Sequence, residues 1–146
     1  MIESFVLIED YYENVYKKYI SITGVKDAEV GTNEINCDDI VFEDEEGWCL
    51  MTLLSGDSCA EEVLLQLSNG KKLAYFYSDD SQMDCEFLVI KDNQIIRKKF
   101  IYADTPELNE DEGNLPCEKD IQFEEWNDID YFIEIGRENP NKLFEL

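Results

Sequence analysis

The sequence contains no histidine and few basic residues. Its 146 residues hold 12 lysines and arginines against 35 aspartates and glutamates, which gives a formal net charge of −23. Without histidine, catalytic triads, cysteine–histidine pairs and most metal hydrolase sites lose their usual base or ligand. Carboxylates alone could still support catalysis, but with so many acids in the chain no particular pair can be identified as an active site. We therefore expect a protein that is not an enzyme and has no catalytic residues.

Motifs that bind nucleotides, metals or cofactors are also missing. The sequence has no GxGxxG, no GxxxxGK[ST] and no GxSxG. Its five cysteines are widely spaced and form no CxxC: Cys37, Cys49, Cys59, Cys85 and Cys117. Without paired spacing or histidine, a zinc site has no ligand set. We expect free, mostly buried thiols, no metal and no cofactor.

Long apolar runs and a leader signal are absent too. No run of about 18 apolar residues could span a membrane, and the first ten residues have neither a basic segment nor a small-residue cleavage site. A composition that is 44% hydrophobic and 12% aromatic is nevertheless too apolar for a disordered acidic tail. We expect one globular domain, residues 1–146, in the cytoplasm.

The clearest structural signal lies in residues 72–102, which we expect to form the centre of the fold. Apolar runs at 73–77, 85–91 and 94–102 predict three consecutive antiparallel strands, and Asp92-Asn93 is suited to a tight turn. A two-residue turn there would place Val89 opposite Ile96 and Phe87 opposite Lys98. The inward face would then hold six residues: Cys85, Phe87, Val89, Ile96, Phe100 and Tyr102.

Three segments show helical signals. An amphipathic stripe runs through residues 12–20 and ends before Gly24. Residues 58–61 have the spacing of a capping box, ahead of a helix that ends at Asn69-Gly70. A third helix is predicted from an Asn127 cap to Gly136. The sequence therefore predicts an α+β fold: a mostly antiparallel sheet, with a central three-strand meander and about three packed helices.

Acidic residues gather in two blocks, 38–46 and 107–118, both expected on loops. No basic residue lies between Lys26 and Lys71. Charge of this sign excludes nucleic acid and anionic membrane as partners. It leaves two interpretations, a solvated surface kept for solubility or a surface that binds a basic protein. The candidate binding residues are the two blocks with apolar neighbours as anchors: Asp38, Asp39, Phe42, Glu43, Asp44, Glu45, Glu46, Trp48, Glu107, Leu108, Glu110, Asp111, Glu112 and Glu118.

The order of features from residue 48 to residue 130 resembles that of a known class of proteins. A strand with Trp48 leads into 53–56 and a short helix, followed by the aromatic run 75–77, a hairpin with Arg97, an acidic loop before Gly113, and the segment 126–130. This order is similar to that of small acidic immunity proteins of bacterial polymorphic toxin systems, including contact-dependent growth inhibition.

The resemblance implies a cytoplasmic protein that binds a cognate toxin domain and covers its active site or another essential surface. Many such toxins are nucleases with basic faces, so acid on the inhibitor would stand where the substrate carries phosphate. We therefore expect an immunity protein, monomeric when free, whose partner is a basic toxin domain. The alternative is an acidic nucleic-acid mimic that inhibits a DNA-binding or restriction protein.

Overall fold

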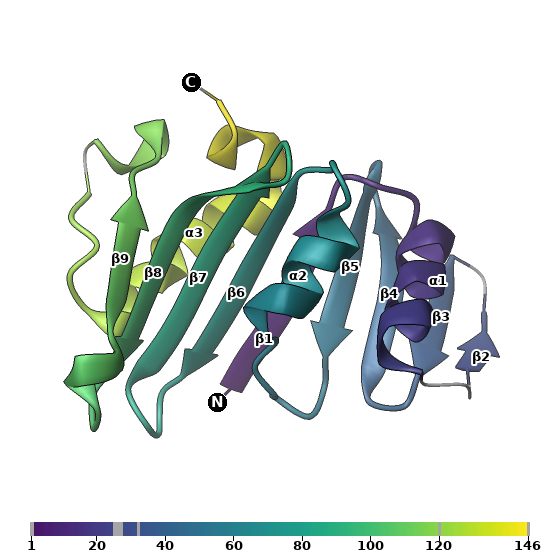
Figure 1. The fold of residues 1–146 in the computed structure, drawn as a ribbon, viewed down its shortest axis with the longest axis horizontal. Helices are drawn as coiled ribbons and strands as arrows, with labels where there is room; N and C mark the ends of the chain where they lie inside the picture. The colour runs from purple at the N-terminus through teal and green to yellow at the C-terminus, as the bar shows by residue number, and fades with distance from the viewer. Residues whose placement is uncertain (1, 25–27, 32, 120, 146) are drawn as a thin grey trace.

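One antiparallel sheet runs through the protein, whose computed structural model describes residues 2–24, 28–31, 33–119 and 121–145 (Figure 1). Within these residues the sheet has nine strands in the order β2-β3-β4-β5-β1-β6-β7-β8-β9. The strands are β1 (Ile2–Ile8), β2 (Ala28–Val30), β3 (Glu34–Cys37), β4 (Ile40–Glu45), β5 (Trp48–Leu53), β6 (Leu73–Asp79), β7 (Asp84–Lys91), β8 (Gln94–Tyr102) and β9 (Glu110–Gly113). The fold is therefore α+β and mostly sheet.

The sheet is centred on β1, not on residues 72–102 as the sequence suggested. β1 pairs with β5 on one side and with β6 on the other. From Phe5 to Ile8 every residue is buried, because one face of the strand packs in each of two cores. A strand that is buried on both faces has a continuous run of apolar residues, and residues 5–8 form such a run. β6, β7 and β8 are consecutive neighbours in one half of this larger sheet.

The helices cover opposite faces of the sheet. The described residues contain three α-helices: α1 (Tyr12–Thr23), α2 (Glu61–Ser68) and α3 (Ile129–Glu138). Figure 1 shows α1 and α2 in front of the sheet and α3 behind β6 to β8. We call these two sides the α1 face and the α3 face. None of the helices in the described residues is long and apolar enough to cross a bilayer.

Each face has its own hydrophobic core. On the α1 face the core includes Val6, Phe42 and Tyr75, and the residues of α1 and α2 pack against it. On the α3 face the ring of Phe87 stacks with Phe123 and with Phe132 of α3, and Phe76 packs beside Phe87. Because α3 covers one end of its face only, the α3 face of β3 and β4 carries no helix among the described residues (Figure 1).

The β7–β8 hairpin has the predicted turn but a different register. Asp92 and Asn93 both adopt positive φ, 53° and 63°, as a two-residue hairpin turn requires. A bulge at Ile96 then shifts the ladder by one residue, so that Val89 lies opposite Arg97. The predicted pairing of Val89 with Ile96 is therefore wrong.

The same bulge divides the predicted inward face between the two cores. Cys85, Phe87 and Val89 pack in the core of the α3 face, with Ile96 beside them. Phe100 instead packs against the core of the α1 face, and Tyr102 lies on the same side. The extra residue also turns the side chain of Arg97 into the α3 face.

The acidic segment after β8 was expected to be a loop, but it adds the edge strand β9. Its register places Asp111 opposite Lys99 and Glu112 opposite Lys98, so cross-strand charge pairing supports a strand of low β-propensity. Gly113 ends this strand at φ 77°, and a Cβ atom there would lie 2.1 Å from the Ile96 carbonyl oxygen. Only glycine fits such a close backbone approach. The 3₁₀ turns η1 (Pro106–Leu108) and η2 (Pro116–Glu118) flank β9.

Two predicted helix ends also differ from the structure. α2 begins after Ala60, whose side chain has no polar group to cap the helix, and Glu61 forms an ion pair with Lys98 instead of closing a capping box. Gly136 does not end α3 but lies inside it, where a Cβ atom would come within 2.8 Å of the Phe76 ring. The glycine lets α3 pack close to the sheet. The short turns η3 (Trp126–Asp128) and η4 (Pro140–Leu143) precede and follow the helix.

Candidate functional site

The two acidic blocks lie far apart in the structure. Residues 38–46 form the β3–β4 turn, strand β4 and the turn after it, whereas residues 107–118 surround β9 at the edge of the sheet. Six strand spacings separate β4 from β9, which is roughly 29 Å at about 4.8 Å per spacing. The structure therefore presents two separate acidic surfaces, and β4 and β9 are strands where loops were expected.

Of the three apolar residues predicted to anchor a partner, one is well exposed. Phe42 is 0% exposed and packs against the rings of Tyr16 and Tyr19, so it cannot serve as a surface anchor. Trp48 is also buried, stacked on Phe144 with ring centroids 5.7 Å apart. Leu108 is 60% exposed. The apolar character of Phe42 and Trp48 reflects their place in the two cores.

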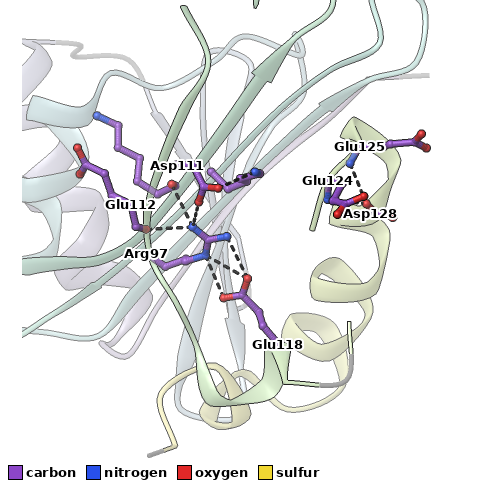
Figure 2. Close-up of polar contacts among 9 residues, drawn as sticks. Arg97, Asp111, Glu112, Glu118, Glu124, Glu125 and Asp128 are labelled. Atoms are coloured by element: carbon purple, nitrogen blue, oxygen red, sulfur yellow. Dashed lines mark hydrogen bonds and ion pairs between the residues drawn. The ribbon is translucent and has the colours of Figure 1, made fainter. Parts of the chain in front are cut away.

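At the β9 end, acidic side chains are paired with the bases of β8. Figure 2 shows Arg97 between Asp111 and Glu118. Its Nε and Nη2 donate to the two carboxylate oxygens of Glu118 at 2.9 and 3.0 Å, and Nη1 donates to Asp111 Oδ1 at 2.6 Å and to the Glu112 carbonyl at 3.0 Å. The side chains of Arg97 and Glu118 are 5% and 6% exposed. Glu118 is therefore a structural residue that holds the segment after β9 on the sheet.

These contacts shift the pKa values of the paired groups. Burial acts to lower the pKa of Arg97, but the hydrogen bonds that its guanidinium donates to Asp111 and Glu118 outweigh burial and hold the pKa above its usual value. Hydrogen bonds from Lys99 and then Arg97 lower the pKa of Asp111. Lys99 Nζ lies 2.9 Å from Asp111 Oδ2. The guanidinium and the Asp111 carboxylate are both held in their charged forms.

Lys98 neutralises acids on the other face of the same strand. Its Nζ lies 2.6 Å from Glu61 Oε1 and 2.9 Å from Glu110 Oε2. Burial acts to lower the pKa of Lys98, and the hydrogen bonds to Glu61 and Glu110 raise it overall. Three consecutive bases of β8 thus hold acids of α2, β9 and η2. Of the predicted binding residues at this end, the side chains of Glu107, Leu108 and Glu112 are the ones that no described ion pair engages.

Among the described residues, the first acidic block has no such partners. Because Phe42 points into the core of the α1 face, its neighbours Glu43 and Glu45 point to the open α3 face of β4. Glu43 lies directly opposite Glu34 of β3. Burial, then repulsion from Glu34 and from Glu45, raises the pKa of Glu43. Among the salt bridges of the described residues, none involves these three acids or Glu46.

A groove of about 970 Å³ lies beside this open face. We call it the α3-face groove; it runs between strands β1 and β5 and the C-terminal end of α3 with η4. Its lining residues come from three separate parts of the chain: Ile2–Phe5 with Leu7; Glu45, Glu46, Trp48, Leu50 and Thr52–Leu54; and Gly136–Asn141. The groove therefore joins part of the first acidic block to an apolar floor.

The position of α3, and hence of one groove wall, is set at the start of the helix. The backbone N–H groups of Glu124 and Glu125 donate to Asp128 Oδ2 at 2.9 and 2.8 Å, as Figure 2 shows. From there the helix runs across the sheet, with Phe132 in the core and Gly136 against Phe76. The groove opens where α3 ends, next to Arg137 and Glu138.

A cluster of two tyrosines and a glutamate on the α1 face was not foreseen from the sequence. Tyr75 Oη donates to Glu86 Oε1 at 2.7 Å and accepts from the Cys59 N–H at 2.9 Å, and Tyr102 Oη donates to the other Glu86 oxygen. Burial and the neighbouring carboxylate raise the pKa of both tyrosines above the usual value. Both hydroxyls therefore stay protonated, and the cluster ties the chain before α2 to the sheet.

Carboxylates are the chemical groups that both acidic surfaces present. Within the residues that the structure describes, no group of three or more histidine, cysteine or acidic side chains is arranged to hold a metal ion. The open face and groove offer carboxylates and apolar surface, which suit contact with a cationic partner. Comparison with protein-family models, with curated proteins and with solved structures found no match.

Proposed function

We propose that the protein is an immunity protein that binds and neutralises a cognate toxin domain carrying a basic surface. The observation that carries the proposal is the unequal pairing of the two acidic surfaces. At the β9 end, Arg97, Lys98 and Lys99 engage the neighbouring acids. Glu43 of β4 faces Glu34 of β3 without a base paired to either among the described residues, although the resulting repulsion opposes folding.

Uncompensated acid of this kind favours association with a basic protein. A net charge of −23 attracts a cationic domain over a long range and accelerates encounter. The apolar floor of the α3-face groove then offers surface that can be desolvated, which rim charges alone do not provide. A nuclease domain has a basic face because its substrate is a polyanion. An acidic inhibitor bound there would exclude the substrate.

In this role the protein acts by binding, in the cytoplasm of the cell that it protects, and needs neither a cofactor nor a catalytic residue. Its specificity comes from complementarity to one toxin domain. Tight inhibition then depends on a small number of buried anchor contacts, with the acids setting the rate of association.

Co-expression tests the proposal. The toxin domain encoded beside this gene is expressed in bacterial cells, alone and together with the protein, and growth is followed. We expect growth to stop with the toxin alone and to be restored when the protein is present, with a stable complex recovered from the cells. Persistent growth arrest, or neighbouring genes that encode no toxin, would contradict the proposal.

A further inference from the structure

The α3-face groove has the size and lining of a site for protein side chains. Its volume, about 970 Å³, lies at the upper end of the range of about 300–1,000 Å³ found for ligand sites. Phe5 and Leu50 form part of an apolar floor, and Ile2 and Leu54 at its rim are 44% and 65% exposed. Exposed large apolar side chains around a hollow are typical of interaction surfaces.

The charge at the groove is strongly one-sided. Four carboxylates line it, those of Glu3, Glu45, Glu46 and Glu138, whereas Arg137 is the single base among the described lining residues. The acidic surface continues along the open face of β4 to Glu43. A partner that fills the groove with apolar side chains would therefore also need cationic groups to meet these acids.

Arg137 shows how the groove accommodates a guanidinium. Its Cζ lies 4.9 Å from the centroid of the Phe5 ring, and its Nη2 lies 3.4 Å from Glu3 Oε2. A guanidinium stacked on an aromatic ring and held by a carboxylate is a favourable arrangement. The Arg137 side chain is 61% exposed, so it covers only part of this wall.

We infer that the α3-face groove, together with the open face of β4, receives an arginine-bearing segment of the toxin domain with interspersed apolar side chains. This inference rests on the proposed function and names the surface that performs it. The β9 end is excluded as the main site because its acids already hold Arg97, Lys98 and Lys99. Arg137 occupies a position that a cationic side chain of the partner can share or take over.

The first arm of the test uses a probe of defined chemistry. A short synthetic peptide of alternating arginine and leucine is titrated into the whole ¹⁵N-labelled protein, and chemical-shift changes are mapped by NMR. A peptide of alternating arginine and serine serves as a control for charge without apolar contact. We expect the changes to cluster at β1, β4, β5 and the end of α3, and the leucine peptide to bind more tightly. Changes centred on β9, or equal binding of the two peptides, would overturn the inference.

Matched variants form the second arm. Neutralising Glu43, Glu45 and Glu46 together as glutamines should weaken binding of the leucine peptide about tenfold. The matched control changes three exposed acids at the β9 end, Asp104→Asn with Glu107→Gln and Glu112→Gln, and should alter affinity much less. If the two triple variants weaken binding equally, the effect is one of net charge and the groove is not the site.

Two further substitutions in the groove predict effects of opposite sign, and a third substitution near β9 serves as the control. Leu54→Lys, which places a cation and a longer side chain at the rim, should weaken binding, whereas Leu108→Lys, at a residue of similar exposure near β9, should not. Arg137→Ala removes the competing guanidinium and should tighten binding. Unchanged affinity in both groove variants would refute the assignment.

The outcomes distinguish the inference from the proposed function. If the protein protects cells from the toxin but the variants that lose protection are those at Asp104, Glu107 and Glu112, the function stands and the groove assignment is wrong. If the peptide binds the groove as expected but no toxin is neutralised, the groove is a cation-binding surface and the immunity function is wrong.

Discussion

Replacing Arg97 with methionine would leave the carboxylate of Glu118 buried without its cation. The two side chains are 5% and 6% exposed and share paired hydrogen bonds of 2.9 and 3.0 Å. Leu115 N–H, at 2.6 Å, would remain as the donor to Glu118. Removing one partner of a buried ion pair typically costs about 3–5 kcal/mol, a large part of a total stability of about 5–15 kcal/mol. We therefore expect Arg97→Met to lower the free energy of unfolding by about 3–5 kcal/mol.

Two companion variants test whether this cost comes from the unpaired charge. Arg97→Lys keeps the charge but lacks the planar guanidinium, so it should lower the free energy of unfolding by less than Arg97→Met does. The double variant Arg97→Met with Glu118→Leu removes both charges from the buried site. It should be more stable than Arg97→Met alone, because replacing a buried pair by apolar groups is often close to neutral.

The assay is urea unfolding followed by tryptophan fluorescence, combined with amide hydrogen exchange at β9. Trp48 lies in the core of the α3 face and Trp126 packs against that core, so the fluorescence of both reports on this side of the sheet. Exchange shows whether the segment after β8 detaches before the rest unfolds. If Arg97→Met lowered the free energy of unfolding by less than about 1 kcal/mol and the amides of β9 were still protected from exchange, the reasoning would be refuted. The reasoning would also be refuted if the double variant lost as much stability as Arg97→Met and Glu118→Leu lose when their separate effects are added.

Three other outcomes are expected. Gly113→Ala should destabilise the protein by more than about 1 kcal/mol and deprotect β9 in hydrogen exchange, since its Cβ would lie 2.1 Å from a carbonyl oxygen at φ 77°; unchanged exchange would contradict the close approach. Glu43→Gln should stabilise the protein by about 0.2–1 kcal/mol at neutral pH, because Glu34 lies directly opposite. Burial and its acidic neighbours raise the pKa of Glu43 above 4.5, so the charged carboxylate destabilises the fold fully only above that raised pKa. The stability gained by Glu43→Gln should therefore vanish below pH 4.5; a stability gain that persists in acid would contradict repulsion as its cause. Thiol titration of the unfolded, unreduced protein should count five free cysteines, and a count of one or three would mean disulfides.

Local patterns in the sequence predicted much of the fold on either side of β1. The Asp92-Asn93 turn follows from residue preferences at positive φ, and the apolar stripe of residues 12–20 follows from helical periodicity. α1 ends as expected at Gly24, which adopts the left-handed conformation at φ 77°. These features depend on neighbours in the sequence, and that information is present in a single chain.

The features that were missed depend on contacts between distant segments. β9 has the composition of a solvated loop and becomes a strand because Lys98 and Lys99 stand opposite its acids. The bulge at Ile96 changes which face each later side chain occupies, and a strict two-residue alternation does not reveal it. Gly136 resembles a helix end but is needed for close packing on Phe76.

The candidate site was partly accessible from charge alone. The density of acids in residues 38–46 singled out Glu43, Glu45 and Glu46, which lie on or beside the open α3 face. The groove itself is assembled from residues near 2, 50 and 140, so no local pattern could indicate it. At the second block the sequence could not show that Glu118 is buried against Arg97.

The most direct test of the central claim is the rate at which the purified protein associates with the toxin domain encoded beside its gene, measured by stopped-flow over a series of salt concentrations. Screening of long-range attraction should slow association steeply as salt rises, with a much smaller change in dissociation. The Glu43, Glu45 and Glu46 triple glutamine variant should associate more slowly and show a weaker dependence on salt. Association that is independent of salt, or unaffected by this variant, would contradict the claim that these acids bind a basic toxin.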